Sequence, residues 1–396
     1  MAVETDVSEL RERQKKKARR SLLIKFFAVL IVALLVLIAV FSKDMWYPYL
    51  DGILTKIPDA VKKEDDGSAA LAQGKFPIAI EGGSDYQIKP MDDSFALIDD
   101  SHFRVYGTDG TMILEKQHAF SNPILTTSGK KALIYDLGGN SFSLESKHKT
   151  LYEKTTSQPI LMADISGDVA AVVTKSDKYL AQLDVYSSEG NNIFTYKSYD
   201  SRIVDVTFNS DSSGCVITTL SASGGLVRSG LICLDFSITD MKWRSQEVDT
   251  LAVATQFDDE GNIVIIGDDR CVYFDPVGNI IEEHEYNDEL VDYSASKKLT
   301  AVLLKSNALR KYSLLLVNST RCTEAVNVDL PESASHIFVN GDMVYIMTGK
   351  GICTYNNYGQ EIDNEKLSDA YEDFCKIGGY VFLLGYDEIN RINFSG

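Results

Sequence analysis

The chain is dominated by a repeated pattern of four short strand-like runs separated by turn sequences. Its clearest copy spans residues 251–286. There, DDEG at 258–261 and DPVG at 275–278 separate neighbouring runs, and such sequences close hairpins because Gly accepts a positive φ and Pro fixes φ. The run IVII at 263–266 is apolar at every position, which is typical of a strand covered on both faces. One such meander cannot bury both of its faces, so the pattern predicts that copies pack on each side.

Copies of the pattern follow one another through most of the chain. In each, the third run ends near an aromatic or apolar residue before a turn. These end points are Tyr106, Leu144, Tyr186, Phe236, Phe274, Val317, Tyr355 and Phe394. They recur at intervals of 38 to 50 residues, which is the repeat length of β-propeller blades with four strands each.

The two ends of the repeated region complement each other. Seven complete units begin near Tyr86, Pro123, Pro159, Arg202, Leu251, Leu290 and Ser335. An eighth begins at Tyr371 but ends after its third run, while the run at 75–81 precedes the first unit and belongs to none. We therefore predict an all-β, eight-bladed β-propeller that this N-terminal strand closes, which leaves no open sheet edge. Extra residues at 221–229 in the fourth unit leave seven blades as the alternative.

A different composition precedes the propeller. Residues 1–20 form a basic tail, and residues 21–42 contain the uninterrupted apolar run FFAVLIVALLVLIAVF, whose length suits one transmembrane α-helix. A cleaved signal peptide is the alternative, but the segment has only a poor cleavage sequence. Residues 43–74, with Pro58 and a charged cluster, are expected to be a stalk before the propeller at 75–396.

Charge predicts the orientation of the chain and excludes one class of partner. Seven Lys and Arg lie at 11–20, so the positive-inside rule places the N-terminus in the cytoplasm and the propeller outside the cell membrane. The chain carries a net charge of −18, whereas residues 1–25 hold eight basic and four acidic residues. The remainder, with 31 basic and 53 acidic residues, carries −22 and would repel nucleic acid phosphates.

The cysteines show no metal-binding or redox spacing. Six are scattered without a CxxC pair: Cys215, Cys233, Cys271, Cys322, Cys353 and Cys375. Most lie in strand-like runs, so we expect buried thiols, with Cys353 and Cys375 as the pair to test for a disulfide.

One insertion marks a candidate interaction loop. Ser223, Gly224, Gly225 and Arg228 lie in the longest unit, and no GK[ST] sequence follows as a phosphate loop would require. A long hairpin is the simpler interpretation, and a loop that projects from a rigid ring is a frequent binding element.

No sequence pattern identifies a catalytic, cofactor or metal site. The cluster EEHE at 282–285 is expected on a solvated outer strand, where alternation divides its side chains between two faces. NSDSSG at 209–214 begins like a calcium loop but has Leu220 where the last ligand should be, so a turn explains it. Neither GxSxG nor HExxH occurs.

The anchor, the stalk and the degenerate repeat, with phrases such as VYGTDG at 105–110 and VYSSEG at 185–190, resemble the DUF5711 family of membrane-anchored propellers of Gram-positive, Clostridia-type bacteria. More loosely they resemble WD40-like and quinoprotein-like propellers. The chain lacks the regular Trp-Asp endings of WD40 repeats, since Trp46 and Trp243 are its only tryptophans. The resemblance implies no assigned activity, and no quinone or calcium site follows from it.

These observations favour a non-enzymatic binding or scaffold module, anchored to the membrane by one helix, for an envelope protein, a peptide or a glycan. One alternative is a polysaccharide lyase or hydrolase that uses carboxylates in the central funnel, where converging carboxylates and aromatic platforms would support it. The other is a ligand sensor, although the cytoplasmic tail is shorter than a signalling domain.

Overall fold

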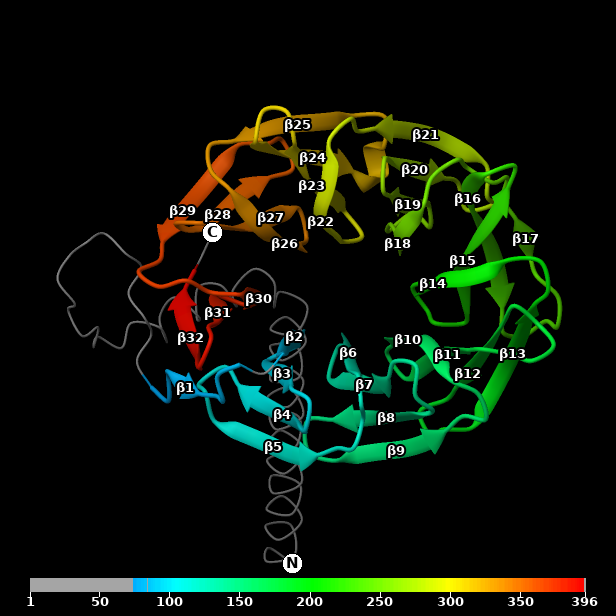
Figure 1. Cartoon of the computed structure of the whole chain (residues 1–396), viewed down its shortest axis with the longest axis horizontal. Coiled ribbons are helices and arrows are strands. Elements are labelled where there is room, and N and C mark those ends of the chain that lie inside the picture. Colours follow the sequence, from blue (N-terminus) through cyan, green and yellow to red (C-terminus); the bar gives the residue numbers. More distant parts are fainter. Residues whose placement is uncertain (1–73, 84, 395–396) are drawn as a thin grey trace, which may run out of the picture. The chain divides into compact units, whose positions relative to one another are not determined.

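The computed structural model describes residues 74–83 and 85–394. Within these residues the chain forms eight four-stranded antiparallel sheets around a central axis (Figure 1). The predicted all-β propeller with eight blades is confirmed, and the seven-bladed alternative is wrong. The predicted tail, membrane helix and most of the stalk lie outside the described residues.

Sheets are numbered here in chain order, and their strands run from the axis outwards. Sheets 1 to 4 contain β2 (Gln87–Met91), β3 (Ser94–Ile98), β4 (His102–Gly107) and β5 (Met112–Gln117); β6 (Pro123–Ser128), β7 (Lys131–Asp136), β8 (Ser141–Ser146) and β9 (Thr150–Thr155); β10 (Ile160–Ser166), β11 (Val169–Thr174), β12 (Ala181–Tyr186) and β13 (Asn192–Ser198); β14 (Arg202–Phe208), β15 (Gly214–Ser223), β16 (Leu226–Asp235) and β17 (Trp243–Arg244).

Sheets 5 to 8 follow the same plan, and the last of them includes the first strand of the described chain. They contain β18 (Ala252–Phe257), β19 (Ile263–Gly267), β20 (Arg270–Phe274) and β21 (Ile280–Glu285); β22 (Glu289–Ala295), β23 (Leu299–Ser306), β24 (Lys311–Asn318) and β25 (Ala325–Leu330); β26 (Ala334–Asn340), β27 (Met343–Thr348), β28 (Gly351–Asn356) and β29 (Glu361–Lys366); β30 (Asp373–Ile377), β31 (Tyr380–Leu384), β32 (Glu388–Asn393) and β1 (Ile78–Ala79). A 3-10 turn, η1 (Ser319–Arg321), follows β24.

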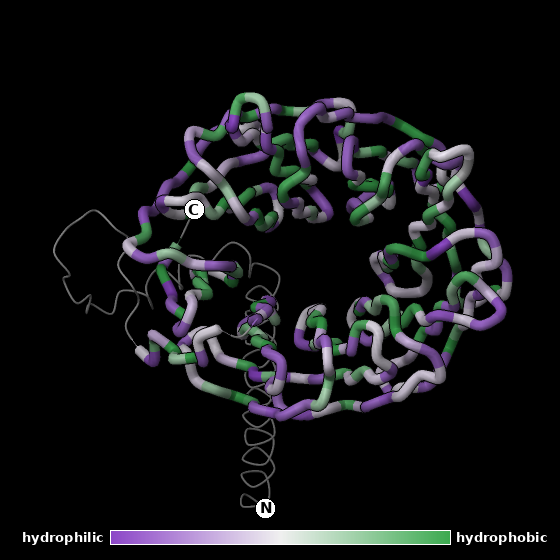
Figure 2. Tube along the Cα trace, in the orientation of Figure 1, coloured by the Kyte–Doolittle hydropathy of each residue, from purple (hydrophilic) through white to green (hydrophobic). Residues whose placement is uncertain are grey.

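Burial within a sheet follows the sequence pattern. Every residue of β19 is buried, as expected for a strand with a sheet on each side. In the outermost strand of the same sheet, β21, half-buried and exposed residues alternate. Figure 2 shows hydrophobic stretches inside the sheets and hydrophilic ones at many of the turns. The outer-strand prediction for residues 282–285 and the turn prediction for residues 209–214 are confirmed.

Eight hydrophobic clusters hold the ring together, and each joins two neighbouring sheets. Between sheets 3 and 4, for example, Val173 and Val185 pack with Ile217 and Ile232. The cluster between sheets 8 and 1 has the same form and completes the circle. One cluster lies between each pair of consecutive sheets, from sheets 1 and 2 round to sheets 8 and 1. Because apolar burial scales with area, this repeated packing is the main stabilising term.

Pairing of the chain's two ends closes the ring. In the ladder between β1 and β32, Ile78 lies opposite Ile389. The backbone N–H of Ile80 donates to the carbonyl of Asp387 at 2.9 Å. The Phe76 ring lies 5.9 Å from the Phe382 ring, centroid to centroid. The predicted closing strand of the last sheet is therefore confirmed, but it is only two residues long, Ile78–Ala79, within the predicted run at 75–81.

Polar side chains also connect neighbouring inner strands near the axis. The Gln87 side chain both donates to the Pro123 carbonyl at 2.8 Å and accepts from the Leu125 N–H at 3.0 Å, which joins sheets 1 and 2. Ser294 accepts from the Val339 N–H at 2.9 Å and joins sheets 6 and 7. These bonds satisfy backbone groups that have no sheet partner on the axial side.

Candidate functional site

The strand order gives the ring two different faces. Each sheet is an antiparallel meander, so the turns between second and third strands share one face with the segments that link consecutive sheets. We call this the connecting face. The turns between first and second strands and between third and fourth strands lie on the opposite face, which we call the turn face.

Exposed apolar side chains are concentrated on the connecting face. Eight large ones lie in its segments: Leu137, Leu180, Tyr199, Leu226, Val227, Leu251, Leu309 and Tyr386. The segments of the turn face carry four: Ile238, Met241, Val277 and Tyr358. Tyr199 is 71% exposed and Leu309 is 69% exposed. Leu226 and Val227 are adjacent in the chain, and contiguous exposed apolar residues commonly mark interaction surfaces, so the connecting face is the better candidate.

The predicted interaction loop is the longest hairpin of the connecting face. β15 and β16 each have 10 residues, whereas the corresponding strands of the other sheets have five to eight. Ser223 is paired with Leu226 in the ladder, so Gly224 and Gly225 form a two-residue turn. Their φ angles are +64° and +86°, which Gly adopts without strain and which suit a tight hairpin.

The tip of this hairpin, residues 221–228, extends beyond both neighbouring strands. The ladder with β14 ends at Leu220, and the pairing on the other edge ends at Ser229, which bridges to Val248. Leu226 is 53% exposed and Val227 is 42% exposed. The tip therefore presents two apolar side chains and unpaired strand edges.

Arg228 stabilises the hairpin itself. Its Nε donates to Oδ1 of Asp249 at 2.7 Å, and the Ser221 hydroxyl donates to Oε1 of Glu247 at 2.9 Å. Both acidic partners belong to the segment that links sheets 4 and 5. The structure thus places Gly224 and Gly225 at the exposed tip, whereas Arg228 binds the segment that links sheets 4 and 5.

A cavity of about 310 Å³ lies beside the axis, between the inner strands of sheets 1, 6, 7 and 8. Its charged lining residues are Lys89, Asp292, His336 and Asp373, and Tyr293 also lines it. Nδ1 of His336 lies 3.7 Å from Oδ2 of Asp292, and hydrogen bonding to this carboxylate raises the pKa of His336. Desolvation raises the pKa of Asp373, although Lys89 and His336 oppose the effect.

The carboxylates of this cavity also have structural partners. Asp292 accepts from the Tyr293 N–H at 2.8 Å and from the Ile337 N–H at 2.9 Å. Asp373 accepts from the Phe374 N–H at 2.7 Å. Each carboxylate therefore compensates a backbone amide at the inner end of its sheet.

Two further inner-strand carboxyl groups have strongly raised pKa values. Desolvation raises the pKa of Asp164 to about 6 and that of Asp205 to about 7, and the charge of Asp164 adds to the shift of Asp205. The Thr126 hydroxyl donates to Asp164 at 3.1 Å, and the Val206 N–H donates to Asp205 at 2.9 Å. Each carboxyl group thus holds a proton through part of the range from pH 4 to 7.

Sequence reasoning missed these axial residues, although a signal existed. Asp164, Asp205, Asp292 and Asp373 occupy similar positions in the first strands of four sheets. Their spacings follow the repeat, but the alternation within each strand did not show which side faces the axis. In β14, for example, a β-bulge between Ile203 and Asp205 shifts the register.

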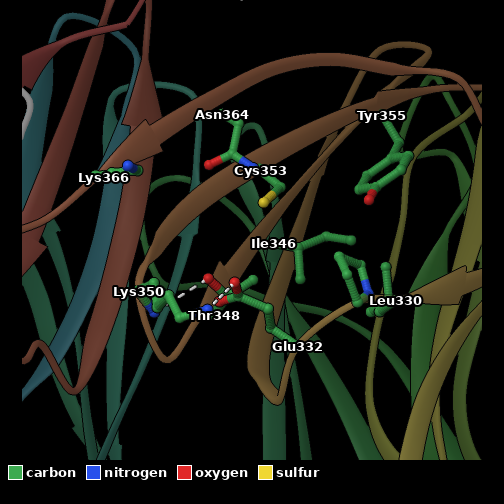
Figure 3. Close-up of a pocket in the computed structure, with 10 residues that line it drawn as sticks. Leu330, Glu332, Ile346, Thr348, Lys350, Cys353, Tyr355, Asn364 and Lys366 are labelled. Carbon is green, nitrogen blue, oxygen red and sulfur yellow. Dashed lines mark hydrogen bonds and ion pairs between the residues drawn. The ribbon is translucent and has the colours of Figure 1, made fainter. Parts of the chain in front are cut away.

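A second cavity, of about 320 Å³, lies between sheets 6 and 7 on the connecting face (Figure 3). Its apolar walls come from Leu330, Ile346, Cys353 and Tyr355. At one end, Lys350 forms an ion pair with Glu332, as Figure 3 shows, while Asn364 and Lys366 complete the polar rim. Burial raises the pKa of the Cys353 thiol to about 11, so it stays protonated at neutral pH.

All six cysteines are free thiols, five of them buried and Cys233 partly buried. The expected buried thiols are confirmed, and Cys353 and Cys375 are not joined. In the described part of the chain, no group of three or more His, Cys, Asp or Glu could hold a metal ion. His284, in the acidic outer strand, contacts the Cys322 carbonyl instead.

The described residues contain no helix of the length and apolar character needed to cross a membrane. The predicted span at 21–42 lies outside them.

The described residues form an eight-bladed β-propeller whose connecting face carries more large exposed apolar side chains than its turn face. The chain belongs to the DUF5711 family, a family of unknown function, whose model matches residues 76–394. No curated protein matches the sequence.

Several solved propellers share the fold at low sequence identity. BamB from Moraxella catarrhalis has 14% identity and a TM-score of 0.52, covering 80% of this chain and 100% of its own. The C-terminal WD40 domain of Sif2 has 13% identity and a TM-score of 0.58, with coverage of 82% and 100%. Sqt1 from Chaetomium thermophilum, solved bound to the N-terminus of the ribosomal protein L10, has 12% identity and a TM-score of 0.58, with coverage of 80% and 99%. At these identities the likeness shows the fold alone.

Proposed function

We propose that this protein is a non-enzymatic binding or scaffold module that uses its connecting face to hold another envelope component. The observation that carries this proposal is the concentration of exposed apolar side chains on that face, which includes the projecting tip with Leu226 and Val227. A rigid ring presents such side chains without an entropic cost of ordering the surface, which favours tight binding. The structural relative bound to a protein segment illustrates that propellers of this fold bind proteins.

The cavity between sheets 6 and 7 supplies an anchor point on the same face. Its apolar walls and polar rim suit one large apolar side chain of a partner, with the Glu332–Lys350 pair at the edge. Binding energy at protein interfaces is concentrated in such side chains that enter pockets. Leu309, on the turn between β23 and β24 of sheet 6, adds exposed apolar area to this face.

The proposal places the propeller outside the cell. Residues 21–42 anchor it as one transmembrane helix, residues 1–20 remain in the cytoplasm, and residues 43–74 hold the ring away from the lipid surface. Partners of this module are then proteins, peptides or glycans of the envelope, and nucleic acid is not among them.

The experiment that tests the binding role is affinity purification from chemically crosslinked membranes. The unchanged full chain is expected to recover one or more envelope proteins, and the double variant L226D/V227D is expected to lose them. A matched control, V277D, places the same charge on the turn face. Equal recovery by all three proteins, or recovery of no partner, would contradict the proposal.

A second candidate function is a carboxylate-dependent polysaccharide lyase or hydrolase in the axial cavity. The observation that favours it is that Asp292 and Asp373 line one cavity together with Tyr293 and His336. The backbone hydrogen bonds of both carboxylates favour the structural role instead. Cleavage of acidic or neutral polysaccharides that is lost in both D292N and D373N would establish the enzyme, and no cleavage by the unchanged chain would remove it.

A further inference from the structure

A third cavity, of about 410 Å³, opens on the connecting face at sheets 2 and 3. It lies between residues 155–158, at the end of β9 and in the segment that links the two sheets, and residues 174–179, at the end of β11 and in the turn before β12. Side chains of β12 and β13 form the rest of its lining: Gln182, Asp184, Tyr186 and Lys197. Unlike the cavity of Figure 3, it is lined mainly by hydroxyl, amide and charged groups.

The cavity is locally cationic on a strongly acidic protein. Lys175, Lys178 and Lys197 are exposed, and none of them forms an ion pair with another described residue. Two carboxylates also line the cavity, and each accepts a hydrogen bond from a neutral amide. Gln158 donates to Asp177 at 2.9 Å, and Asp184 accepts from Gln182 at 2.8 Å. Three lysines and two aspartates give the lining a net charge of +1, so a ligand at this cavity meets more ammonium groups than carboxylates.

Two tyrosines form an aromatic platform at the rim. The rings of Tyr179 and Tyr199 pack edge to face with centroids 4.7 Å apart. Tyr179 lines the cavity, and Tyr199 is 71% exposed. Nζ of Lys197 lies 5.4 Å from the Tyr179 ring centroid, so one ligand could contact both this ammonium group and the tyrosine rings.

The remaining lining groups suit a ligand with many hydroxyls. Thr155, Ser157 and Ser176 carry hydroxyls, and the Gln158 and Gln182 amides lie beside them. Hydroxyls both donate and accept hydrogen bonds, as do amides, so these groups match the hydroxyls of a sugar. Aromatic rings contribute apolar area with a defined face, which suits the C–H face of a sugar ring.

We propose that this cavity binds an anionic glycan, a saccharide chain that carries carboxylate or phosphate groups. The three lysines contact its anionic groups, the tyrosine pair contacts a sugar ring, and the hydroxyl and amide groups bind its hydroxyls. Lysine binds carboxylate and phosphate as a point charge, which tolerates either group. An acidic peptide is the weaker candidate, because peptide anchors are mostly apolar and this lining is not.

This inference deepens the proposed binding role at one site and rests on it, but the two can fail separately. The glycan cavity involves sheets 2 and 3, whereas the proposed protein contact depends on Leu226 and Val227 in sheet 4. The variant L226D/V227D is therefore expected to lose its protein partner and to keep glycan binding. Loss of lysine charge is expected to have the opposite effect.

The test is calorimetric titration of the detergent-solubilised full chain with defined probes. Oligosaccharides with uronic acid carboxylates form one arm, and oligomers of polyol phosphate form the other, so the two sources of negative charge are distinguished. Carboxyl-reduced oligosaccharides of the same length are the neutral control. Poly-glutamate of matched charge represents the acidic peptide.

The expected result is binding of at least one anionic saccharide that weakens as salt is added, and no binding of the neutral control. The triple variant K175Q/K178Q/K197Q should weaken this binding at least about tenfold, and Y199A should weaken it with the charges intact. A matched triple variant on the turn face, K130Q/K297Q/K298Q, should bind normally, and thermal melting should show all variants folded. No binding of either anionic saccharide, equal affinity in the lysine variant, or tighter binding of poly-glutamate would overturn the proposal.

Discussion

The guanidinium group of Arg391 lies over the ring of Phe76, with its carbon 5.1 Å from the ring centroid. The two residues belong to opposite ends of the described chain. The same guanidinium lies 4.4 Å from the centroid of the Tyr380 ring, so it contacts two rings at the junction where β1 pairs with β32. A cation held against an aromatic face contributes about 0.5–2 kcal/mol beyond the apolar contact. This contact supplements the short ladder in which Ile78 lies opposite Ile389.

The closure contact predicts a loss of stability in F76A. The substitution removes both the ring beneath Arg391 and the contact with Phe382, so we expect the free energy of unfolding to fall by about 1–3 kcal/mol. Urea unfolding of the full chain, followed by tryptophan fluorescence, measures it. The control V277A changes a side chain that is 63% exposed and should stay within about 0.5 kcal/mol. Equal unfolding midpoints for the two variants would show that closure does not stabilise the ring.

The axial carboxyl groups predict an unusual dependence of stability on pH. Asp205 has its pKa raised from 3.8 to about 7 by desolvation, so the folded protein holds this proton more tightly than the unfolded chain does. The stabilisation that comes from this bound proton is fully present below about pH 4 and is lost as pH rises to about 7. Over that range the free energy of unfolding falls by at most about 1.4 kcal/mol per pH unit. D205N removes this titrating group. The free energy of unfolding of D205N, minus that of the unchanged protein, should therefore be larger at pH 8 than at pH 4.5. Urea midpoints at the two pH values measure the difference.

Asp211, an exposed carboxylate, serves as the control, because its pKa is lowered and its effect on stability changes with pH in the opposite direction. Hydrogen bonds from Ser213 lower the pKa of Asp211, so its contribution is present above about pH 4 and is lost as pH falls. D211N should thus lose a similar amount of stability relative to the unchanged protein at pH 4.5 and at pH 8, and this difference should shrink only below about pH 4. Parallel pH profiles for D205N and D211N would contradict the assignment of a raised pKa to Asp205.

The free thiols predict a defined order of alkylation. Burial raises the pKa of Cys271 to about 12 and that of Cys353 to about 11, and both are buried. Cys233 is only partly buried, so iodoacetamide at pH 8 should modify it first, because the thiolate is the reacting species. Peptide mass mapping of the native chain should show this order, with C233S slow throughout and all six thiols modified after unfolding. A peptide pair joined through Cys353 and Cys375 would show instead that a disulfide is present.

Much of the fold could be predicted because each sheet repeats the same local chemistry. The apolar run in β19 and the turn at Gly224 and Gly225 each determine local structure from their own residues. Counting eight sheets required one further observation. The repeated region begins with an extra strand that belongs to no complete unit, and its last unit lacks a fourth strand. The pairing of Ile78 with Ile389 follows from that count.

The site could be predicted only in part, because its groups come together through tertiary structure. The Gly224–Gly225 hairpin is local and was predicted, but the ion pair of Arg228 with Asp249 joins residues that only the path of the linking segment brings together. Likewise Lys175 and Lys197 belong to different elements of sheet 3, and no spacing in the sequence indicates that they line one cavity. Charge summed over the chain concealed this local excess of lysine.

The proposed function requires that a partner binds the connecting face and not the turn face. The most direct measurement is site-specific photo-crosslinking in intact membranes, with a photoreactive residue at Val227 or Leu309 on the connecting face and at Tyr358 on the turn face. All three side chains are exposed, so reactivity alone does not distinguish them. We predict that Val227 and Leu309 give the same crosslinked protein, that L226D removes it, and that Tyr358 gives none. Crosslinks from Tyr358 alone, or crosslinks of equal yield and identity from all three positions, would contradict the account.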